Sequence, residues 1–173
     1  RTDRAEVDAG VPDRLGPAAQ QFLDVLRTGI GGEIEIVGQS AEHGVPPEFR
    51  TAVVIPTLFG SVEAVHEALD NLEVQFLANR EAHLHFAVLS DFTDSATETR
   101  PDDASILGAA TEAVRALNAR YAPATQDAFY LFHRPRRWNP REGVWMGWER
   151  KRGKLAEFNH FVLGQAEGAF SVI

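Results

Sequence analysis

The chain has 173 residues, of which 44% are hydrophobic, and a formal net charge of −8 at pH 7. This length suits a single domain with one ordinary hydrophobic core. The acidic balance disfavours a general nucleic-acid binder, because such domains are typically basic overall. The absence of cysteine excludes a disulfide framework and a thiolate metal site, and no apolar run approaches the roughly 18 residues that a membrane span needs.

Residues 1–46 are expected to form a linker that carries one short helix and one candidate strand. Residues 17–29 space their apolar side chains as a helix does and end in glycine. Residues 32–38 alternate acidic and apolar side chains, which is typical of a half-exposed strand. We place the boundary of the main domain at residue 47, so that the domain spans 47–173.

From residue 51 onward, the pattern predicts strands that alternate with helices. Short apolar runs rich in β-branched residues are typical of strands buried on both faces of a sheet. Apolar residues spaced by three and four indicate helices that pack one face against such a sheet. The predicted strands span 51–57, 84–91, 128–134 and 169–173, and the predicted helices span 61–79, 101–121 and 154–164, with a basic loop before the last helix.

This order predicts an α/β, Rossmann-like fold with a mostly parallel sheet and helices on both faces. In such sheets, ligands bind beyond the carboxyl ends of the strands. Three segments fall at that edge: PTLFGS (56–61), SDFTDS (90–95) and HRPRRWNPREG (133–143). The chain contains neither a Gly-x-Gly-x-x-Gly motif nor a Gly-x-x-x-x-Gly-Lys-Ser/Thr motif, which argues against a conventional dinucleotide site and a P-loop.

Asp91 and Asp94 directly follow the second buried strand. A carboxylate at this place could accept a hydrogen bond from a nucleoside base or a ribose hydroxyl. The same run of Asp, Ser and Thr also suits the capping of a turn or a helix, and on spacing alone that structural role is the more frequent one. The two interpretations stay open at this point.

The histidines give little evidence for a metal site. His83 and His85 share one face of a strand at a spacing that metal sites sometimes use, but their place at the strand start favours a packed or surface role. His133 ends the third strand beside the basic loop and is the best functional candidate of the six. We interpret Asp102 and Asp103 as a helix cap, so no metal site is expected in this chain.

Positive charge is concentrated between Arg134 and Lys154. Eight of the 17 Lys and Arg lie there beside two acidic residues, which gives a net charge of +6, while the other nine basic and 23 acidic residues give −14. All three tryptophans also lie in this segment. Arginine interleaved with aromatic residues suits a clamp for a phosphate and a stacked base or sugar, whereas the alternative is a surface loop that packs its tryptophans on the body.

Three stretches closely resemble the glycosyltransferase domain of bacterial cyclic β-1,2-glucan synthases: VVIPTL, LHFAVLSDFTD and FHRPRRWNPREGVWMGWERKRGKLAEFN. The resemblance extends over residues 47–173, and the third stretch is long and unusual. More distantly, the three stretches are similar to processive inverting transferases that use nucleotide sugars. The resemblance implies a nucleotide-diphosphate-sugar transferase fold, of which residues 47–173 are the N-terminal, donor-nucleotide part.

The resemblance also implies a set of residues around UDP-glucose, the expected donor. Asp91 would contact uracil with support from Asp94, and Lys154 would lie near the phosphates or the ribose. The full nucleotide-sugar-binding set would be Pro56, Thr57, Asp91, Asp94, Lys154 and Asn159. Further contacts with phosphate or sugar would come from His133, Arg137, Trp145, Trp148 and Arg150.

For the parent protein, the resemblance implies a membrane-embedded, multidomain enzyme with this domain on the cytoplasmic face of the bacterial inner membrane. It would transfer glucose with inversion to a growing β-1,2-glucan. The Asp-x-Asp motif that holds Mg or Mn is expected after GAFSVI, where this chain stops, so no catalytic residue is assigned here. The piece alone is expected to bind the nucleotide weakly and to be inactive.

Two other hypotheses remain from the sequence. The first is a non-catalytic binding module that uses the basic, Trp-rich segment for an anionic partner or an acidic lipid. The second is a purely structural role, in which an unpaired sheet edge leads the chain to self-associate. Nucleic acid is not an expected partner, because the negative charge elsewhere would repel a long strand.

Overall fold

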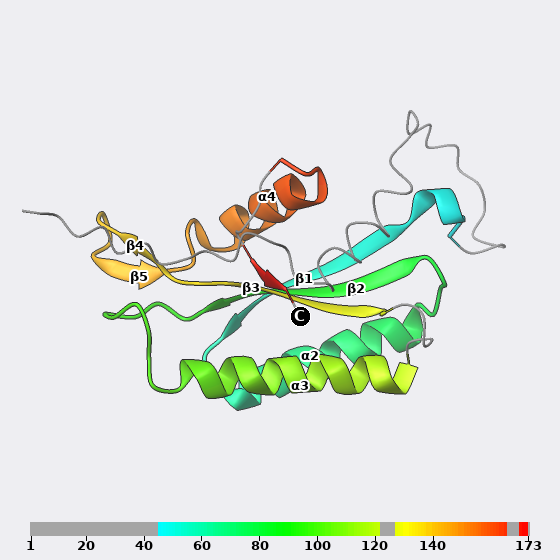
Figure 1. Cartoon of the computed structure of the whole chain (residues 1–173), viewed down its shortest axis with the longest axis horizontal. Coiled ribbons are helices and arrows are strands. Elements are labelled where there is room, and N and C mark those ends of the chain that lie inside the picture. Colours follow the sequence, from blue (N-terminus) through cyan, green and yellow to red (C-terminus); the bar gives the residue numbers. More distant parts are fainter. Residues whose placement is uncertain (1–44, 122–126, 166–169, 173) are drawn as a thin grey trace, which may run out of the picture.

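The computed structural model describes residues 45–121, 127–165 and 170–172 (Figure 1). The helix predicted for 17–29 and the strand predicted for 32–38 lie outside the described residues. The boundary proposed at residue 47 therefore stays a prediction. None of the helices within the described ranges is both long and apolar enough to cross a membrane.

The described chain alternates strands and helices, as the sequence pattern predicts. A short 3-10 helix, Pro47–Phe49, precedes the first strand. The strands are β1 (Thr51–Phe59), β2 (Leu84–Phe92), β3 (Phe129–Arg134), β4 (Arg137–Asn139), β5 (Val144–Met146) and β6 (Ser171–Val172), and the helices are α2 (Val62–Ala78), α3 (Asp103–Tyr121) and α4 (Arg150–Val162).

The main sheet has the strand order β1-β2-β3-β6. Strands β1, β2 and β3 are parallel, which confirms the predicted parallel sheet (Figure 1). The last strand, β6, is antiparallel to β3, although the alternating order predicted a parallel neighbour. Residue alternation along a strand carries no information on its direction, which depends on the path of the preceding connection.

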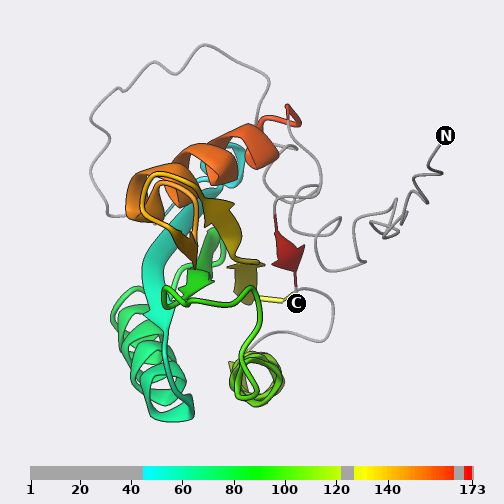
Figure 2. The ribbon, with the colours of Figure 1, turned by 90° about the vertical axis from the view of Figure 1, so that its left-hand side faces the viewer.

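Helices cover both faces of the sheet, as expected for a Rossmann-like fold. Figure 2 shows α4, in orange, on one side of the sheet and α2 and α3, in green, on the other. Helix α2 begins at Ser61, whose hydroxyl accepts a hydrogen bond from the Ala64 N–H at 3.2 Å. The core below the sheet contains the buried faces of α2 and α3, while Phe158 and Phe161 of α4 form a smaller core above it.

The basic segment is more ordered than the predicted loop, and that part of the prediction is wrong. Strands β4 and β5 form an antiparallel hairpin in which Trp138 lies opposite Trp145, with ring centroids 5.9 Å apart. The backbone of Trp145 also exchanges two hydrogen bonds with Ser95, at 2.8 and 2.9 Å. Helix α4 begins at Arg150, four residues before the predicted start. The cross-strand pairing of the two tryptophans stabilises this hairpin.

Candidate functional site

Three charged side chains meet at the carboxyl edge of the parallel strands. Asp91 lies near the end of β2, and its register partners are Leu58 in β1 and Arg134 in β3. Lys154 reaches the same point from the first turns of α4, on the other side of the sheet from α2 and α3. We call Asp91, Arg134 and Lys154 the charged cluster.

The charged cluster is buried and closely paired. Arg134 donates to both oxygens of Asp91, with Nε at 2.7 Å from Oδ1 and Nη2 at 3.0 Å from Oδ2. Lys154 Nζ lies 2.9 Å from the same Oδ2. The exposed fractions of Asp91, Arg134 and Lys154 are 1%, 3% and 2%. Such burial is tolerated only because each charge has a partner.

Lys154 links the cluster to two strands of the sheet. Its Nζ donates to the carbonyl oxygen of Thr57 in β1 at 2.6 Å and to that of Leu89 in β2 at 3.5 Å. Burial lowers the pKa of Lys154, while the Asp91 carboxylate acts in the opposite direction. The contacts with β1 and β2 place the Lys154 amine at the carboxyl edge of the strands, where α/β sheets bind ligands.

Gly147 covers the carboxylate of Asp91. A Cβ at this position would lie 2.5 Å from both Cγ and Oδ2 of Asp91. Only a residue without a side chain allows the backbone that follows β5 to approach the carboxylate this closely. The segment 147–150, which leads from β5 into the first residue of α4, therefore lies over the charged cluster.

The sequence interpretation missed Arg134 and Glu157. Arg134 donates from Nη1 to Glu157 Oε2 at 3.0 Å and from Nη2 to the carbonyl oxygen of Arg150 at 3.2 Å, so it joins β3, α4 and Asp91. One signal was present in the sequence: Arg134 closes an apolar strand whose residues are all buried in the structure. A charged residue at the end of such a strand needs a buried partner.

A second buried arginine, Arg136, anchors the loop that follows β2. It forms a two-pronged ion pair with Asp103, with contacts of 2.6 and 3.0 Å, and it donates from Nε to the Thr93 carbonyl at 2.7 Å. The side chain of Asp103 also accepts the Arg100 N–H at 2.8 Å. Asp103 thus orders the turn before α3 and holds Arg136, a role beyond the predicted helix cap.

The other predicted nucleotide-sugar residues lie around the charged cluster. Pro56 and Thr57 are partly buried near the end of β1, and Asp94 is exposed in the loop after β2. Arg150 bridges Asp94 and Glu142 through contacts of 3.0 and 2.7 Å. Asn159 is exposed on α4 and five residues from Lys154, a spacing that turns the two side chains to different sides of the helix.

The predicted phosphate or sugar contacts of the basic segment differ in their exposure and in their contacts. Arg137 is exposed and lies 3.4 Å from Glu157. Trp145 is partly buried in the hairpin, whereas Trp148 is 42% exposed. The nucleotide-binding roles assigned to all these residues stay predictions, and the geometry brings Asp91, Lys154 and Thr57 together.

His133 lies inside the fold next to the charged cluster. Its Nδ1 is 2.9 Å from the Ser90 hydroxyl, and its ring packs against Phe59 and Phe92. Its Nε2 has no hydrogen-bond partner among the described residues. Burial lowers the pKa of His133 to about 4. The imidazole is therefore neutral at pH 7.

This burial predicts an acid sensitivity. An unfolded histidine titrates near pH 6.5, so the unfolded state binds more protons than the folded state between pH 6.5 and about 4. Stability is therefore expected to fall as pH decreases through this window, by up to about 3 kcal/mol from His133. Urea denaturation at pH 7 and pH 4.5 measures the loss. His133→Phe should reduce it markedly, and an unchanged loss in that variant would contradict the assignment.

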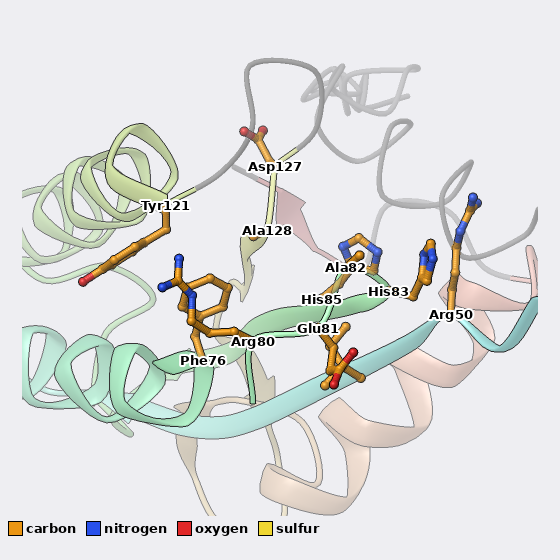
Figure 3. A pocket seen from close by; sticks show the side chains of 11 residues that line it. Arg50, Phe76, Arg80, Glu81, Ala82, His83, His85, Tyr121, Asp127 and Ala128 are labelled. Carbon is orange, nitrogen blue, oxygen red and sulfur yellow. The ribbon is translucent and has the colours of Figure 1, made fainter. Parts of the chain in front are cut away.

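A separate cavity of about 390 Å³ lies at the opposite edge of the sheet. Figure 3 shows Arg50, His83 and His85 on one side of it and Phe76 and Tyr121 on another. His83 and His85, the pair with metal-site spacing, thus lie far from the strand ends that carry Asp91. Within the described ranges, no three His, Cys, Asp or Glu side chains gather as a metal ion would require.

Comparison with known proteins supports the resemblance. No family model matches the chain. The chain is 44% identical over 135 residues to a curated protein named cyclic beta-(1,2)-glucan synthase NdvB, from Rhizobium meliloti (strain 1021). The match includes 78% of this chain and 5% of that relative, so the chain spans only a small part of the relative's length. The chain is therefore related to a segment of the cyclic β-1,2-glucan synthases, as its motifs indicated.

Proposed function

We propose that the chain is the donor-nucleotide part of a glycosyltransferase domain that uses UDP-glucose. The parent protein would transfer glucose to a growing β-1,2-glucan with inversion at the anomeric carbon. The observation that carries the proposal is the contact between Asp91 and Lys154 at the carboxyl edge of the sheet. These two residues are 63 positions apart, and the resemblance assigns both of them to the nucleotide.

The occupancy of the Asp91 oxygens suits contact with a base. A carboxylate offers about four lone-pair sites, two on each oxygen. Oδ2 receives Arg134 and Lys154, whereas Oδ1 receives only Arg134 among the described residues. One acceptor site thus remains on Oδ1 for a uracil N–H. Because Asp91 is 1% exposed, the nucleotide would reach it when the segment 147–150 moves aside.

The cations of this edge suit a departing diphosphate. Negative charge develops on the leaving group during glycosyl transfer, and fixed positive charge stabilises it. Lys154 would interact with the phosphates or the ribose. The described residues offer no group that fits Mg or Mn. On the resemblance, the metal ligands and the catalytic base would come from the rest of the parent, which we place at the cytoplasmic face of the bacterial inner membrane.

Calorimetry with UDP tests the donor site. The 173-residue chain should bind UDP, and Lys154→Met should weaken binding by about tenfold or more, since it removes one charge-assisted hydrogen bond. This variant keeps the Asp91–Arg134 pair and a side chain of similar length, so folding is expected to persist and is checked by a thermal melt. Arg115→Met is the control, because Arg115 is an exposed cation on α3 and should not affect binding.

Two results would contradict the donor assignment. One is equal UDP affinity of the wild type and the folded Lys154→Met variant. The other is absence of UDP binding together with binding to vesicles that contain an anionic phospholipid, which would favour the non-catalytic binding module.

A further inference from the structure

A second hollow lies beside the charged cluster, between the β4–β5 hairpin and the first turn of α4. Its volume is about 650 Å³, within the usual range of roughly 300–1,000 Å³ for small-molecule sites. Its lining includes the side chains of Asn139, Glu142, Met146, Trp148, Arg150 and Arg152. We call this hollow the hairpin cavity.

Two of the three arginines that line the hairpin cavity are paired with carboxylates. Arg150 contacts Glu142 at 2.7 Å and Asp94 at 3.0 Å. Arg152 contacts Glu149 at 2.7 Å. Arg141 also lines the cavity, and no ion pair of its side chain is found among the described residues. A phosphate that bound Arg150 or Arg152 would have to displace a carboxylate and lie near it. An anion therefore gains less here than it would at a group of unpaired cations, although the cavity lies within the basic segment.

The same paired groups suit a neutral polyhydroxyl ligand. A sugar hydroxyl donates one hydrogen bond and accepts others, and here carboxylate oxygens and guanidinium N–H groups lie side by side. Asn139 adds an amide, whose Nδ2 lies 3.4 Å from Glu142 Oε1. With Asp94 included, the arginines Arg141, Arg150 and Arg152 are balanced by the carboxylates of Asp94, Glu142 and Glu149, so the cavity offers donors and acceptors without a net charge.

Trp148 supplies the apolar surface that such a ligand would need. It is 42% exposed and lines the cavity. An exposed indole is a large, rigid platform that loses little conformational entropy on binding, and the apolar face of a pyranose ring can lie flat on it. Trp138 is also exposed, at 47%, but it does not line the cavity.

We propose that the hairpin cavity is a carbohydrate site for a segment of neutral β-linked glucan. Trp148 stacks on one glucose ring, while Arg150, Glu142 and Asn139 bind its hydroxyl groups. The cavity adjoins the charged cluster, because Trp148 directly follows Gly147, which lies on Asp91. The identity of the sugar as glucan rests on the proposed function, whereas the preference for a neutral sugar over an anion rests on the pairing of Arg150 and Arg152 with carboxylates.

Nuclear magnetic resonance tests the site through the three tryptophan indole N–H signals, assigned with single Trp→Phe variants. On titration of the 173-residue chain with a β-1,2-linked glucose tetrasaccharide, the Trp148 signal should shift more than that of Trp138. Trp148→Ala should weaken binding by about tenfold or more. Trp138→Phe is the matched control from the same hairpin, because it keeps an aromatic ring opposite Trp145, and it should bind nearly as the wild type does.

A charge variant tests the preference for a neutral ligand. Glu142→Gln frees Arg150 from one carboxylate, so pyrophosphate should bind the variant better than the wild type, and the tetrasaccharide should bind it less well. A Trp148 signal that moves with pyrophosphate but not with the tetrasaccharide in the wild type would overturn the proposal. So would tetrasaccharide binding that survives Trp148→Ala unchanged.

The two proposals fail separately in these experiments. UDP binding that depends on Lys154, with no response of Trp148 to the tetrasaccharide, overturns the carbohydrate site and leaves the donor site intact. A Trp148 response to the tetrasaccharide without UDP binding supports the carbohydrate site and contradicts the donor assignment.

Discussion

Asp91→Ala is expected to destabilise the chain by about 3–5 kcal/mol, because it leaves Arg134 and Lys154 buried with only part of their charge compensated. Arg134 would keep Glu157, but Lys154 would retain only the carbonyl groups of Thr57 and Leu89. Urea denaturation measured by circular dichroism gives the free energy of unfolding of both proteins. A domain of this size has few kcal/mol to lose, so the variant is expected to be partly unfolded at 37 °C.

Asp94→Ala is the matched control for this experiment. Asp94 also pairs with an arginine, but the side chains of Asp94 and Arg150 are 40% and 53% exposed. The loss should therefore be below about 1 kcal/mol. If Asp91→Ala does not fold, adding Arg134→Met and Lys154→Met should restore stability, since the unpaired charges are removed with their partner. A cost of Asp91→Ala no larger than that of Asp94→Ala would contradict a buried, mutually dependent cluster.

Gly153→Ala is expected to lower the stability of the chain, whereas the same substitution in an ordinary helix interior raises it. Alanine normally stabilises a helix interior by up to about 1 kcal/mol relative to glycine. At Gly153, however, the added Cβ would overlap the carbonyl oxygen of Trp148 and lie 2.9 Å from the Cβ of Glu149. Because the first of these contacts is with backbone, the start of α4 must shift, and we expect a destabilisation of about 1–3 kcal/mol.

Gly108 in α3 is the internal comparison, because a Cβ there meets no atom within 4 Å. Gly108→Ala should raise stability by about 0.4–1 kcal/mol. Thermal and urea denaturation of the two variants together measure the contrast. If both glycines respond alike, the close approach of Gly153 to the Trp148 carbonyl is not present in solution.

The parts of the fold that depend on side-chain periodicity were predictable from the sequence. Helix α2 buries Val65, Leu69, Leu72 and Phe76 along one stripe, and β2 and β3 are almost entirely buried. Those patterns lie within a single segment of the sequence. The direction of a strand depends instead on its connection to the rest of the sheet. Strands β4 and β5 have three residues each, too few for alternation to be recognised.

Some residues of the candidate site were also predictable from the sequence, and others were not. The resemblance assigned Asp91 and Lys154 to one pocket, and the fold brings them within 2.9 Å of each other. The partner that the sequence missed, Arg134, acts through the register of β2 against β3, which no single strand reveals. Gly153 is a further case, because only the folded start of α4 places the Trp148 carbonyl where a Cβ of residue 153 would lie.

The four residues 147–150 contact both the charged cluster and the hairpin cavity. Glu149 and Arg150 both have positive φ, at 52° and 47°, a conformation that costs roughly 1–2 kcal/mol per non-glycine residue. Gly147 seals Asp91, and Trp148 faces the hairpin cavity. A nucleotide that opens the seal must move the sugar platform as well. Bound UDP is therefore expected to change the affinity for glucan, and bound glucan should change the affinity for UDP by the same factor, because the coupling free energy between two sites is reciprocal.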